Sequence, residues 1–412
     1  MGKLEKYSSY KDSGVEWLGE IPEHWEVKKI KFVMNKIQTG TTPSTNNKNF
    51  FDGDLNWFNP KDLNQEILIE SENKLSQLAL DRREIKLFPK DSILIVGIGA
   101  TTGKTSYLTI NGTFNQQITG FHSTIHHNKF LFYVLRNFSK VFLNVASYTT
   151  LPILNNEFFK SFSIVFPPKK EQTKIASFLD EKTAQIDEVI SQKEKLIELL
   201  KERKQIVIND AVTKGLDKDV EMTDSGVEWI GKIPKHWEVI KFKHLFYEKK
   251  KTHDISLNCG SISFGKVIEK NDEKIPASTK ASYQVLNKGE FLINPLNLNY
   301  DLKSLRIGLS DLDVVVSSGY IIIKNKENID KIYFNWLLHR YDISFMKTLG
   351  AGVRQTLNFG DIAETLLVNP PLEEQIKIAE YIENQTSKID IAIELQQNYI
   401  SKLKEYKASL ID

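Results

Sequence analysis

The chain has 412 residues, of which 41% are hydrophobic and 26% are charged, and its 55 Lys and Arg against 53 Asp and Glu leave a formal net charge of +2. This length predicts two or three domains, the composition excludes a wholly disordered chain, and the balanced charge on its face argues against a strongly electrostatic partner such as DNA. The single cysteine, Cys259, excludes a disulfide framework and a cysteine-cluster zinc site.

Two further absences concern location. No apolar run approaches the ~20 residues of a membrane span, and the residues after Met1 lack the apolar core of a secretion signal. Together with the lone cysteine, which fits a reducing compartment, these features lead us to expect a cytoplasmic protein.

The chain contains an internal repeat. Residues 12–27, a Trp-rich segment, return as residues 224–239 with 13 of 16 positions identical at an offset of 212. The block Pro167–Ala176 returns as Pro370–Ala379 at an offset of 203. Two repeated blocks in the same order indicate a tandem duplication with a unit of about 200 residues, too long for a solenoid, and we expect the halves to pack with pseudo-two-fold symmetry.

Each half has the same order of parts. We predict Trp-rich segments at 1–27 and 223–239, variable domains at 28–166 and 240–369, a central long helix and linker at 167–222, and a C-terminal long helix at 370–412. In both variable domains a turn precedes an apolar strand (90–95 and 288–293), and an apolar helical pattern follows (129–134 and 331–336). The predicted fold class is α+β, with two mixed α/β domains separated by two long helices.

The two long helices carry apolar residues at alternating steps of three and four. Sustained heptads with charged flanks predict a coiled-coil seam, which we expect to be antiparallel, and residues 171–213 as one helix would be about 65 Å long. The alternative is that each helix packs only on its own domain. The predicted seam comprises Ile175, Leu179, Ile186, Val189, Leu196, Leu200 and Val207 on the first helix, and Ile378, Ile382, Ile389, Ala392, Tyr399, Leu403 and Leu410 on the second.

Counting charge by segment changes the first impression. Residues 27–166 carry 16 Lys and Arg against 10 Asp and Glu, a balance of +6, and residues 239–369 carry 18 against 14, a balance of +4. The helical and Trp-rich segments are neutral to acidic and restore the total of +2. Basic domains on acidic helices suit phosphate contact by the domains, although such balances also occur on ordinary surfaces.

Three patterns resemble catalytic or metal-binding motifs but lack their spacing. The loop Gly97–Thr105 has Ile98 where a phosphate-binding loop requires its first glycine, and a strand rather than a helix follows it. Asn369–Leu372 lacks the aromatic residue with which amino-methyltransferases hold a flipped base, and prolines are natural at a helix start. His24 and His236 recur beside tryptophans, where packing is the simpler role, and His126–His127 lacks metal-ligand spacing. We predict no catalytic residue and no metal site.

Several polar loops offer the residue types that read bases in the grooves of DNA, namely Asn, Gln, Arg and hydroxyls. Each could instead be a solvated loop. The candidate DNA-binding residues are Thr41, Thr42, Ser44, Lys48, Thr101, Thr102, Lys104, Asn115, Gln116 and Gln117 in the first variable domain, and Asn294, Asn297, Asn299, Tyr300, Lys303, Arg306, Ser317, Ser318, Tyr320, Arg354 and Gln355 in the second.

This arrangement resembles the specificity subunit of type I restriction–modification systems. The residues that carry the resemblance are the two Trp-rich segments, the two helix starts at Pro167 and Pro370, and the elements Gly99–Lys104 and Asn115–Gln117. The resemblance covers essentially the whole chain.

The resemblance implies two target-recognition domains, each reading one half of a split, asymmetric DNA site, with the helix pair fixing the gap between the half-sites. It also implies assembly with two methyltransferase subunits and two restriction subunits that act as translocase–nucleases. Those partners would use S-adenosylmethionine, ATP and Mg²⁺, while this chain would bind no cofactor and catalyse nothing. Two other classes remain open: an enzyme with its own methyltransferase or NTPase activity at the Gly97–Thr105 loop, and a purely structural coiled-coil scaffold.

Overall fold

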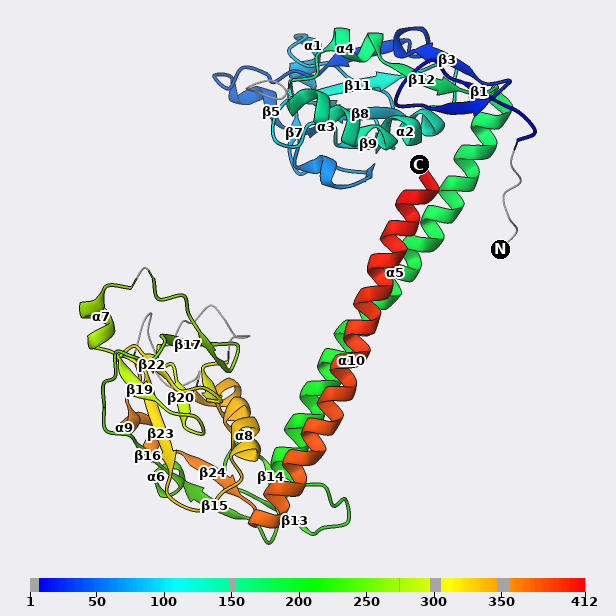
Figure 1. Ribbon diagram of the computed structural model, residues 1–412. Helices are drawn as coiled ribbons and strands as arrows, with labels where there is room; N and C mark the ends of the chain where they lie inside the picture. The colour runs from blue at the N-terminus through cyan, green and yellow to red at the C-terminus, as the bar shows by residue number, and fades with distance from the viewer. Residues whose placement is uncertain (1–6, 148–152, 274, 297–304, 347–355, 412) are drawn as a thin grey trace. The chain divides into compact units, whose positions relative to one another are not determined.

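The computed structural model describes residues 7–147, 153–273, 275–296, 305–346 and 356–411. The chain forms two compact units, the first comprising residues 1–191 and 400–412 and the second residues 192–399. Two long helices, α5 (Lys169–Lys214) and α10 (Leu372–Ile411), contribute to both units (Figure 1). We describe each unit by itself.

The first unit is built on a five-stranded sheet with the strand order β4-β11-β8-β9-β6. All five residues of β8 are buried, because the side chains on its two faces belong to two different hydrophobic cores. The strands of this sheet are β4 (Lys36–Thr39), β6 (Ile67–Leu68), β8 (Ser92–Val96), β9 (Thr105–Leu108) and β11 (Ile118–His122).

Smaller sheets complete the first unit. A three-stranded sheet has the order β10-β5-β7, and two antiparallel pairs join β1 to β2 and β3 to β12. These strands are β1 (Tyr10–Asp12), β2 (Glu20–Pro22), β3 (Glu26–Lys29), β5 (Phe51–Phe58), β7 (Lys74–Leu75), β10 (Thr113–Phe114) and β12 (Ser163–Phe166). The short helices are η1 (Ile30–Phe32), η2 (Lys48–Phe50), η3 (Asp62–Asn64), α1 (Gln77–Asp81), α2 (Asn128–Asn137), α3 (Ser139–Ser147) and α4 (Asn156–Ser161).

The second unit repeats the frame with a four-stranded sheet of order β16-β23-β20-β21. All strands of the second unit, in this sheet and in its smaller pairs, are β13 (Met222–Asp224), β14 (Lys232–Pro234), β15 (Glu238–Lys241), β16 (Phe246–Glu248), β17 (Gly260–Ser263), β18 (Lys266–Glu269), β19 (Gln284–Leu286), β20 (Phe291–Ile293), β21 (Ile307–Leu309), β22 (Val314–Val316), β23 (Ile321–Asn325) and β24 (Leu366–Asn369). Its short helices are α6 (Phe242–Leu245), α7 (Ala277–Ala281), α8 (Lys331–Ser344) and α9 (Phe359–Ala363).

The two units correspond element by element. The order β4-β11-β8-β9 matches β16-β23-β20-β21, and the pair β3–β12 matches β15–β24. The turn before β8 holds Asp91 at φ 65° and the turn before β20 holds Gly289 at φ 81°, so both copies use one left-handed residue there. The two frames therefore share one fold, and this confirms the predicted fold class.

Residue pairing across the duplication is slightly different from the sequence expectation. His127 caps α2 and Asp330 caps α8, which are 203 residues apart, the same offset as the helix starts. The predicted alignment of Lys129 with Lys331, at an offset of 202, is therefore wrong by one residue, because an apolar pattern follows both lysines and does not by itself locate the cap.

Each long helix packs on its own domain and also on the other helix. Ala176 and Leu179 of α5 belong to a core of the first unit, and Ile382 of α10 belongs to the core of the second unit. In that unit Lys204 Nζ lies 2.7 Å from Asp390 Oδ2, and in the first unit Lys407 Nζ lies 2.7 Å from Asp187 Oδ2. Adding 203 to Lys204 and Asp187 gives Lys407 and Asp390, so the same two positions of the repeat form an antiparallel interhelical ion pair in each unit.

The predicted seam is wrong at three of its fourteen positions. Val189, Leu196 and Tyr399 are 39%, 41% and 47% exposed, whereas Ile190, Ile197 and Ile400 beside them are 8%, 6% and 8% exposed. Of the other predicted positions, Leu179, Ile186, Val207, Ile378 and Ile382 are buried, and Ile175, Leu200, Ile389, Ala392, Leu403 and Leu410 are half-buried.

The physical reason is that polar residues complete the buried stripe. Thr183 is 7% exposed, and its hydroxyl donates to the Leu179 carbonyl at 2.7 Å, which lets it replace an apolar residue in the stripe. The buried positions therefore run from Leu179 four residues to Thr183, three to Ile186 and four to Ile190, so Val189 falls one residue outside the stripe.

Candidate nucleic-acid interface

The repeated Trp-rich segments hold the starts of the long helices. In the first unit the Glu171 carboxylate accepts from Trp25 Nε1 at 2.9 Å and contacts His24 Nε2 at 2.8 Å. In the second unit Glu374 makes the same contacts, accepting from Trp237 Nε1 at 2.9 Å and meeting His236 Nε2 at 2.6 Å. These two carboxylate clasps explain why the His-Trp pair and the helix start repeat together, and they give both histidines a structural role.

Burial alone would raise the pKa of the Glu171 carboxyl. Hydrogen bonds from Trp25, His24 and Tyr7 outweigh that effect and hold the pKa below its usual value. The carboxylate is therefore ionised at neutral pH and acts as the acceptor of the clasp.

The following glutamines fix each helix start to its variable domain. Gln172 donates from Nε2 to the Pro167 carbonyl at 2.9 Å and accepts from the His127 backbone N–H at 3.2 Å. Gln375 does the same with Pro370, at 2.8 Å, and with Asp330, at 2.8 Å. The Pro-Pro segments are thus helix starts, and Asn369 accepts from Gln375 Nε2 at 3.2 Å.

The Gly97–Thr105 loop joins two antiparallel strands, β8 and β9, and no helix follows it. Amides of this loop bond to nearby backbone carbonyls: Gly103 N donates to Val96 O at 2.9 Å and Lys104 N to Thr101 O at 3.2 Å. A phosphate-binding loop needs those amides to face the ligand. Lys104 points its ammonium to the Asn64 side-chain oxygen, and Thr101 is half-buried, so side chains are what this loop presents outward.

A cavity of about 400 Å³ lies beside this loop. Lys104 from the loop and Arg136 and Lys140 from the helical side line it. Arg136 pairs with Glu66, which leaves Lys104 and Lys140 as cations at the cavity. Thr102, which is 3% exposed, donates to Gly99 O at 2.6 Å, so this candidate serves the turn and is not positioned to touch a ligand.

The Asn115–Gln117 run divides by role. Asn115 is 8% exposed; its amide donates to Asn59 Oδ1 at 3.2 Å and its carbonyl oxygen accepts from the Gln117 backbone at 3.0 Å. Gln117 is half-buried, whereas Gln116 is exposed and meets Thr42. The prediction of Asn115 as a base reader is wrong, because its polar atoms are engaged in the turn.

The remaining candidates of the first unit surround this point. Thr41 is half-buried with its carbonyl accepting from Trp57 Nε1 at 3.2 Å, and Thr42, Ser44 and Lys48 are exposed. The structure brings Thr42 together with Gln116 and Gln117 at one end of the central sheet. Lys104 lies elsewhere, at the cavity beside the Gly97–Thr105 loop.

Arg306 is not available to DNA. It is 6% exposed, and its Nη2 and Nε lie 2.8 and 2.9 Å from Asp342 Oδ1, while its backbone N–H donates to Asp342 Oδ2 at 2.6 Å. Asp342 is fully buried on α8. This ion pair fastens the start of β21 to α8, so the prediction of Arg306 as a base reader is wrong.

The other candidates of the second unit lie at the surface or outside the described residues. Ser318 is exposed, and Asn294, Ser317 and Tyr320 are half-buried. Ser317 and Ser318 offer backbone carbonyls to Gln284 and Lys251. The candidates outside the described residues are Asn297, Asn299, Tyr300, Lys303, Arg354 and Gln355.

One residue near the first-unit candidates escaped the sequence analysis. Asn156 opens α4, and its side chain accepts from Thr39 Oγ1 at 3.0 Å beside Gln116. In the sequence, Asn155–Asn156 before a helix is a capping signal, and Asn155 does cap α4. Nothing in the sequence shows that the second asparagine turns toward the sheet.

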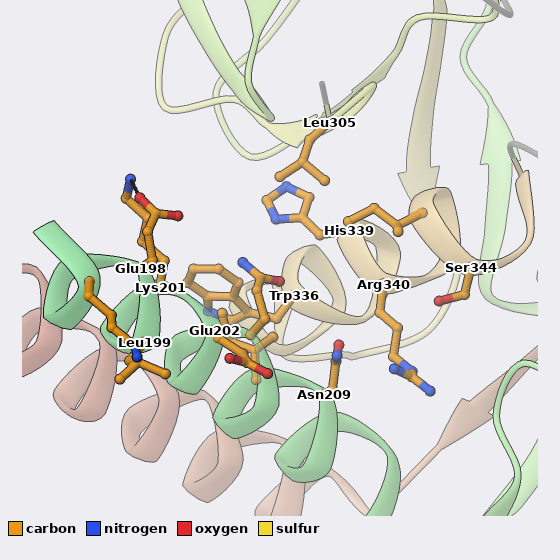
Figure 2. Close-up of a pocket in the computed structure, with 14 residues that line it drawn as sticks. Glu198, Leu199, Lys201, Glu202, Asn209, Leu305, Trp336, His339, Arg340 and Ser344 are labelled. Atoms are coloured by element: carbon orange, nitrogen blue, oxygen red, sulfur yellow. Dashed lines mark hydrogen bonds and ion pairs between the residues drawn. The ribbon is translucent and has the colours of Figure 1, made fainter. Parts of the chain in front are cut away.

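A separate cleft of about 900 Å³ lies in the second unit between α5 and α8. Figure 2 shows Trp336, His339 and Arg340 from α8 across from Glu198, Leu199 and Glu202 of α5. Burial lowers the pKa of His339 to about 4, so its imidazole is neutral at physiological pH. None of the candidate DNA-binding residues within the described ranges lines this cleft.

Neither a metal-binding cluster nor a membrane span is present in the described residues. Among them there is no group of three or more His, Cys, Asp or Glu side chains placed to hold a metal ion. In the same part of the chain no helix is long and apolar enough to span a membrane.

Comparisons with known proteins agree with the duplicated frame. The type I restriction modification DNA specificity domain matches residues 22–199 and again residues 234–400. The MjaIX specificity subunit of Methanocaldococcus jannaschii is 24% identical over 402 residues, covering 90% of this chain and 88% of that protein. The EcoR124I/EcoR124II specificity subunit of Escherichia coli is 26% identical over 233 residues, covering 54% of this chain and 48% of that protein.

Solved structures show the same fold. A chain from a type I R-M system superposes with a TM-score of 0.69 at 14% identity, covering 95% of this chain and 97% of that one. The HsdS subunit from Thermoanaerobacter tengcongensis superposes with a TM-score of 0.54 at 14% identity, covering 95% and 96%. With two matches to the specificity domain that together span most of its length, the chain belongs to the family of type I restriction–modification specificity subunits and carries two target-recognition domains.

Proposed function

We propose that the chain reads a bipartite, asymmetric DNA site, each target-recognition domain contacting one half. The observation that carries this proposal is the duplicated frame with unlike polar loops. The Gly/Thr loop after β8 and the Asn115–Gln117 run of the first unit have counterparts of different sequence after β20 and before β23. Two domains with one fold and different reading surfaces suit two different half-sites.

The charge distribution supports DNA as the ligand. The two recognition domains hold balances of +6 and +4, while the chain as a whole is at +2. Phosphate contacts supply affinity and base contacts supply sequence preference. The proposed contacts within the described residues are Thr41, Thr42, Ser44, Lys48, Thr101, Lys104, Gln116 and Gln117 in the first domain, and Asn294, Ser317, Ser318 and Tyr320 in the second.

The long helices supply a surface for partner subunits. In the second unit each helix carries exposed apolar side chains on a face not used for the ion-paired contact: Leu196, Leu199 and Ile206 on α5, and Ile391, Leu395 and Tyr399 on α10. Exposed apolar stripes at helical spacing are typical of helix-docking surfaces. We assign this surface to the methyltransferase subunits of the complex.

The specificity subunit itself is non-catalytic. We propose that two methyltransferase and two restriction subunits bring S-adenosylmethionine, ATP and Mg²⁺ to the complex, which acts on double-stranded DNA in the cytoplasm. The amides of Thr102, Gly103 and Lys104 are hydrogen-bonded to nearby backbone carbonyls, which does not favour an NTPase or methyltransferase site at the Gly97–Thr105 loop.

The test is methylome sequencing of cells that express this chain with its methyltransferase partner. We expect methylated adenines in one motif made of two specific half-sites separated by a fixed run of unspecified bases. A continuous motif, a palindromic motif, or no methylation dependent on this chain would contradict the proposal.

A further inference from the structure

A small cleft lined by both polar and apolar side chains opens at one end of the central sheet of the first unit. It holds about 330 Å³ and lies between strands β4 and β11, the loop that carries Gln116, and the start of α4. Thr39, Thr119 and Asn156 lie within it, and Gln116 is exposed at its rim. These residues sit among the proposed DNA contacts, so this inference rests on the proposed function.

Two carboxamides in this cleft have their oxygens already engaged. Asn156 Oδ1 accepts from Thr39 Oγ1 at 3.0 Å and from Thr119 Oγ1 at 3.4 Å. Gln116 Oε1 accepts from Thr42 Oγ1. Within the described residues neither Gln116 Nε2 nor Asn156 Nδ2 donates a hydrogen bond. The threonines therefore orient both amides so that their NH₂ groups are presented as donors.

A donor-only amide discriminates among base edges. In the major groove guanine presents two adjacent acceptors, O6 and N7, whereas adenine presents the acceptor N7 beside the donor N6–H₂. A glutamine that can offer both its oxygen and its nitrogen pairs with adenine. A glutamine whose oxygen is turned toward Thr42 presents its NH₂ group to the base, and two N–H bonds match guanine.

A DNA phosphate would also accept from these amides. The residues that line the cleft include no Lys or Arg, and Glu157 stands among them, paired with Lys160 at 2.7 Å. A carboxylate without a lining cation disfavours a phosphate, whose contacts are dominated by Lys and Arg. The cleft is thus suited to a neutral base edge.

We propose that Gln116 reads a guanine in the half-site bound by the first recognition domain, donating from Nε2 to O6 and N7. Thr42 is a positioning residue that sets the orientation of the amide. Asn156 is a second donor at the same position.

The experiment measures methylation by the complex reconstituted from this chain and its methyltransferase partner. The substrates are oligonucleotide duplexes carrying each of the four bases at every position of the first half-site. With the wild-type chain we expect one position at which guanine is preferred over adenine by about 5- to 140-fold, the range of one good base contact. A wild-type complex that methylates no bipartite site would instead refute the proposed function.

Three variants separate the roles. Gln116→Ala should remove the preference at that position while the other positions of both half-sites stay unchanged, which also shows that both recognition domains are folded. Thr42→Val frees the amide to turn over, so adenine should become an accepted base there, with the guanine preference reduced to within about 3-fold. Thr42→Ser keeps the hydroxyl and should retain the wild-type preference.

Two results would overturn the inference. One is an unchanged motif in Gln116→Ala. The other is an equal loss of methylation on all duplexes in Gln116→Ala, which would make the contact a phosphate contact. A Thr42→Ser variant that relaxes the motif as much as Thr42→Val would remove Thr42 from its positioning role.

Discussion

The Arg306–Asp342 pair allows a quantitative test of how the second recognition domain is held together. Asp342→Ala removes a fully buried acceptor that takes two N–H hydrogen bonds from Arg306 and lies 2.8 Å from its Nη2. Breaking a buried ion pair costs about 3–5 kcal/mol, and the orphaned backbone N–H adds about 1–3 kcal/mol. A total of about 4–8 kcal/mol is a large part of the 5–15 kcal/mol that stabilises a typical domain.

The matched control is the double variant Arg306→Met with Asp342→Leu. Replacing a buried ion pair with apolar residues of similar volume is often neutral or stabilising, so the double variant should recover most of the loss. Amide hydrogen exchange at β21 and α8 is the suitable assay, because a chain with two units need not unfold in one step. A double variant as unstable as Asp342→Ala would refute the ion-pair reasoning, and a folded double variant that reads a different second half-site would show that Arg306 contacts DNA.

Three further predictions use the helices and the clasps. The pKa of Glu171 lies below 4.5 in the folded chain, so the stability that its carboxylate contributes is present above pH 4.5 and is lost as the pH falls. In thermal melting, wild type should be more stable than Glu171→Gln at pH 7, and the two melting temperatures should converge in acid. A difference that stays constant with pH would contradict this. The second prediction lengthens both helices by about 10 Å, with seven residues inserted in α5 between Leu196 and Lys204 and seven in α10 between Asp390 and Gln396. The DNA spacer between the half-sites should lengthen by up to about 3 base pairs. An unchanged spacer would show that the helices do not determine its length. The double variant Leu199→Lys with Leu395→Lys should reduce co-purification of the methyltransferase at least 10-fold. The control Glu394→Lys, next to Leu395, should not reduce it. If the control reduced co-purification as much as the double variant, the apolar face would not be the docking surface.

The duplication and the helix positions could be predicted because they depend on local signals. Repeated blocks, helix-starting prolines and apolar periodicity place α5 and α10 almost to the residue. The failure of the Gly97–Thr105 loop as a nucleotide site was also predictable, since one misplaced glycine and a following strand suffice to exclude it.

What sequence could not provide depends on three-dimensional partners. Val189 and Ile190 are adjacent and both apolar, and only the position of the other helix decides which of the two is buried. In the sequence Arg306 follows polar residues, as a base-contacting arginine would. Its fully buried partner Asp342 is 36 residues away, so the sequence does not show that the two form an ion pair. Asn156 looks like part of a helix cap, and only the folded sheet brings it beside Thr39 and Gln116.

The central claim is that each recognition domain reads its own half-site. The most direct measurement is methylome sequencing after residues 240–369 are replaced by the corresponding domain of another family member. We predict that one half of the methylated motif changes and the other half stays the same. A change in both halves, or in neither, would contradict the account.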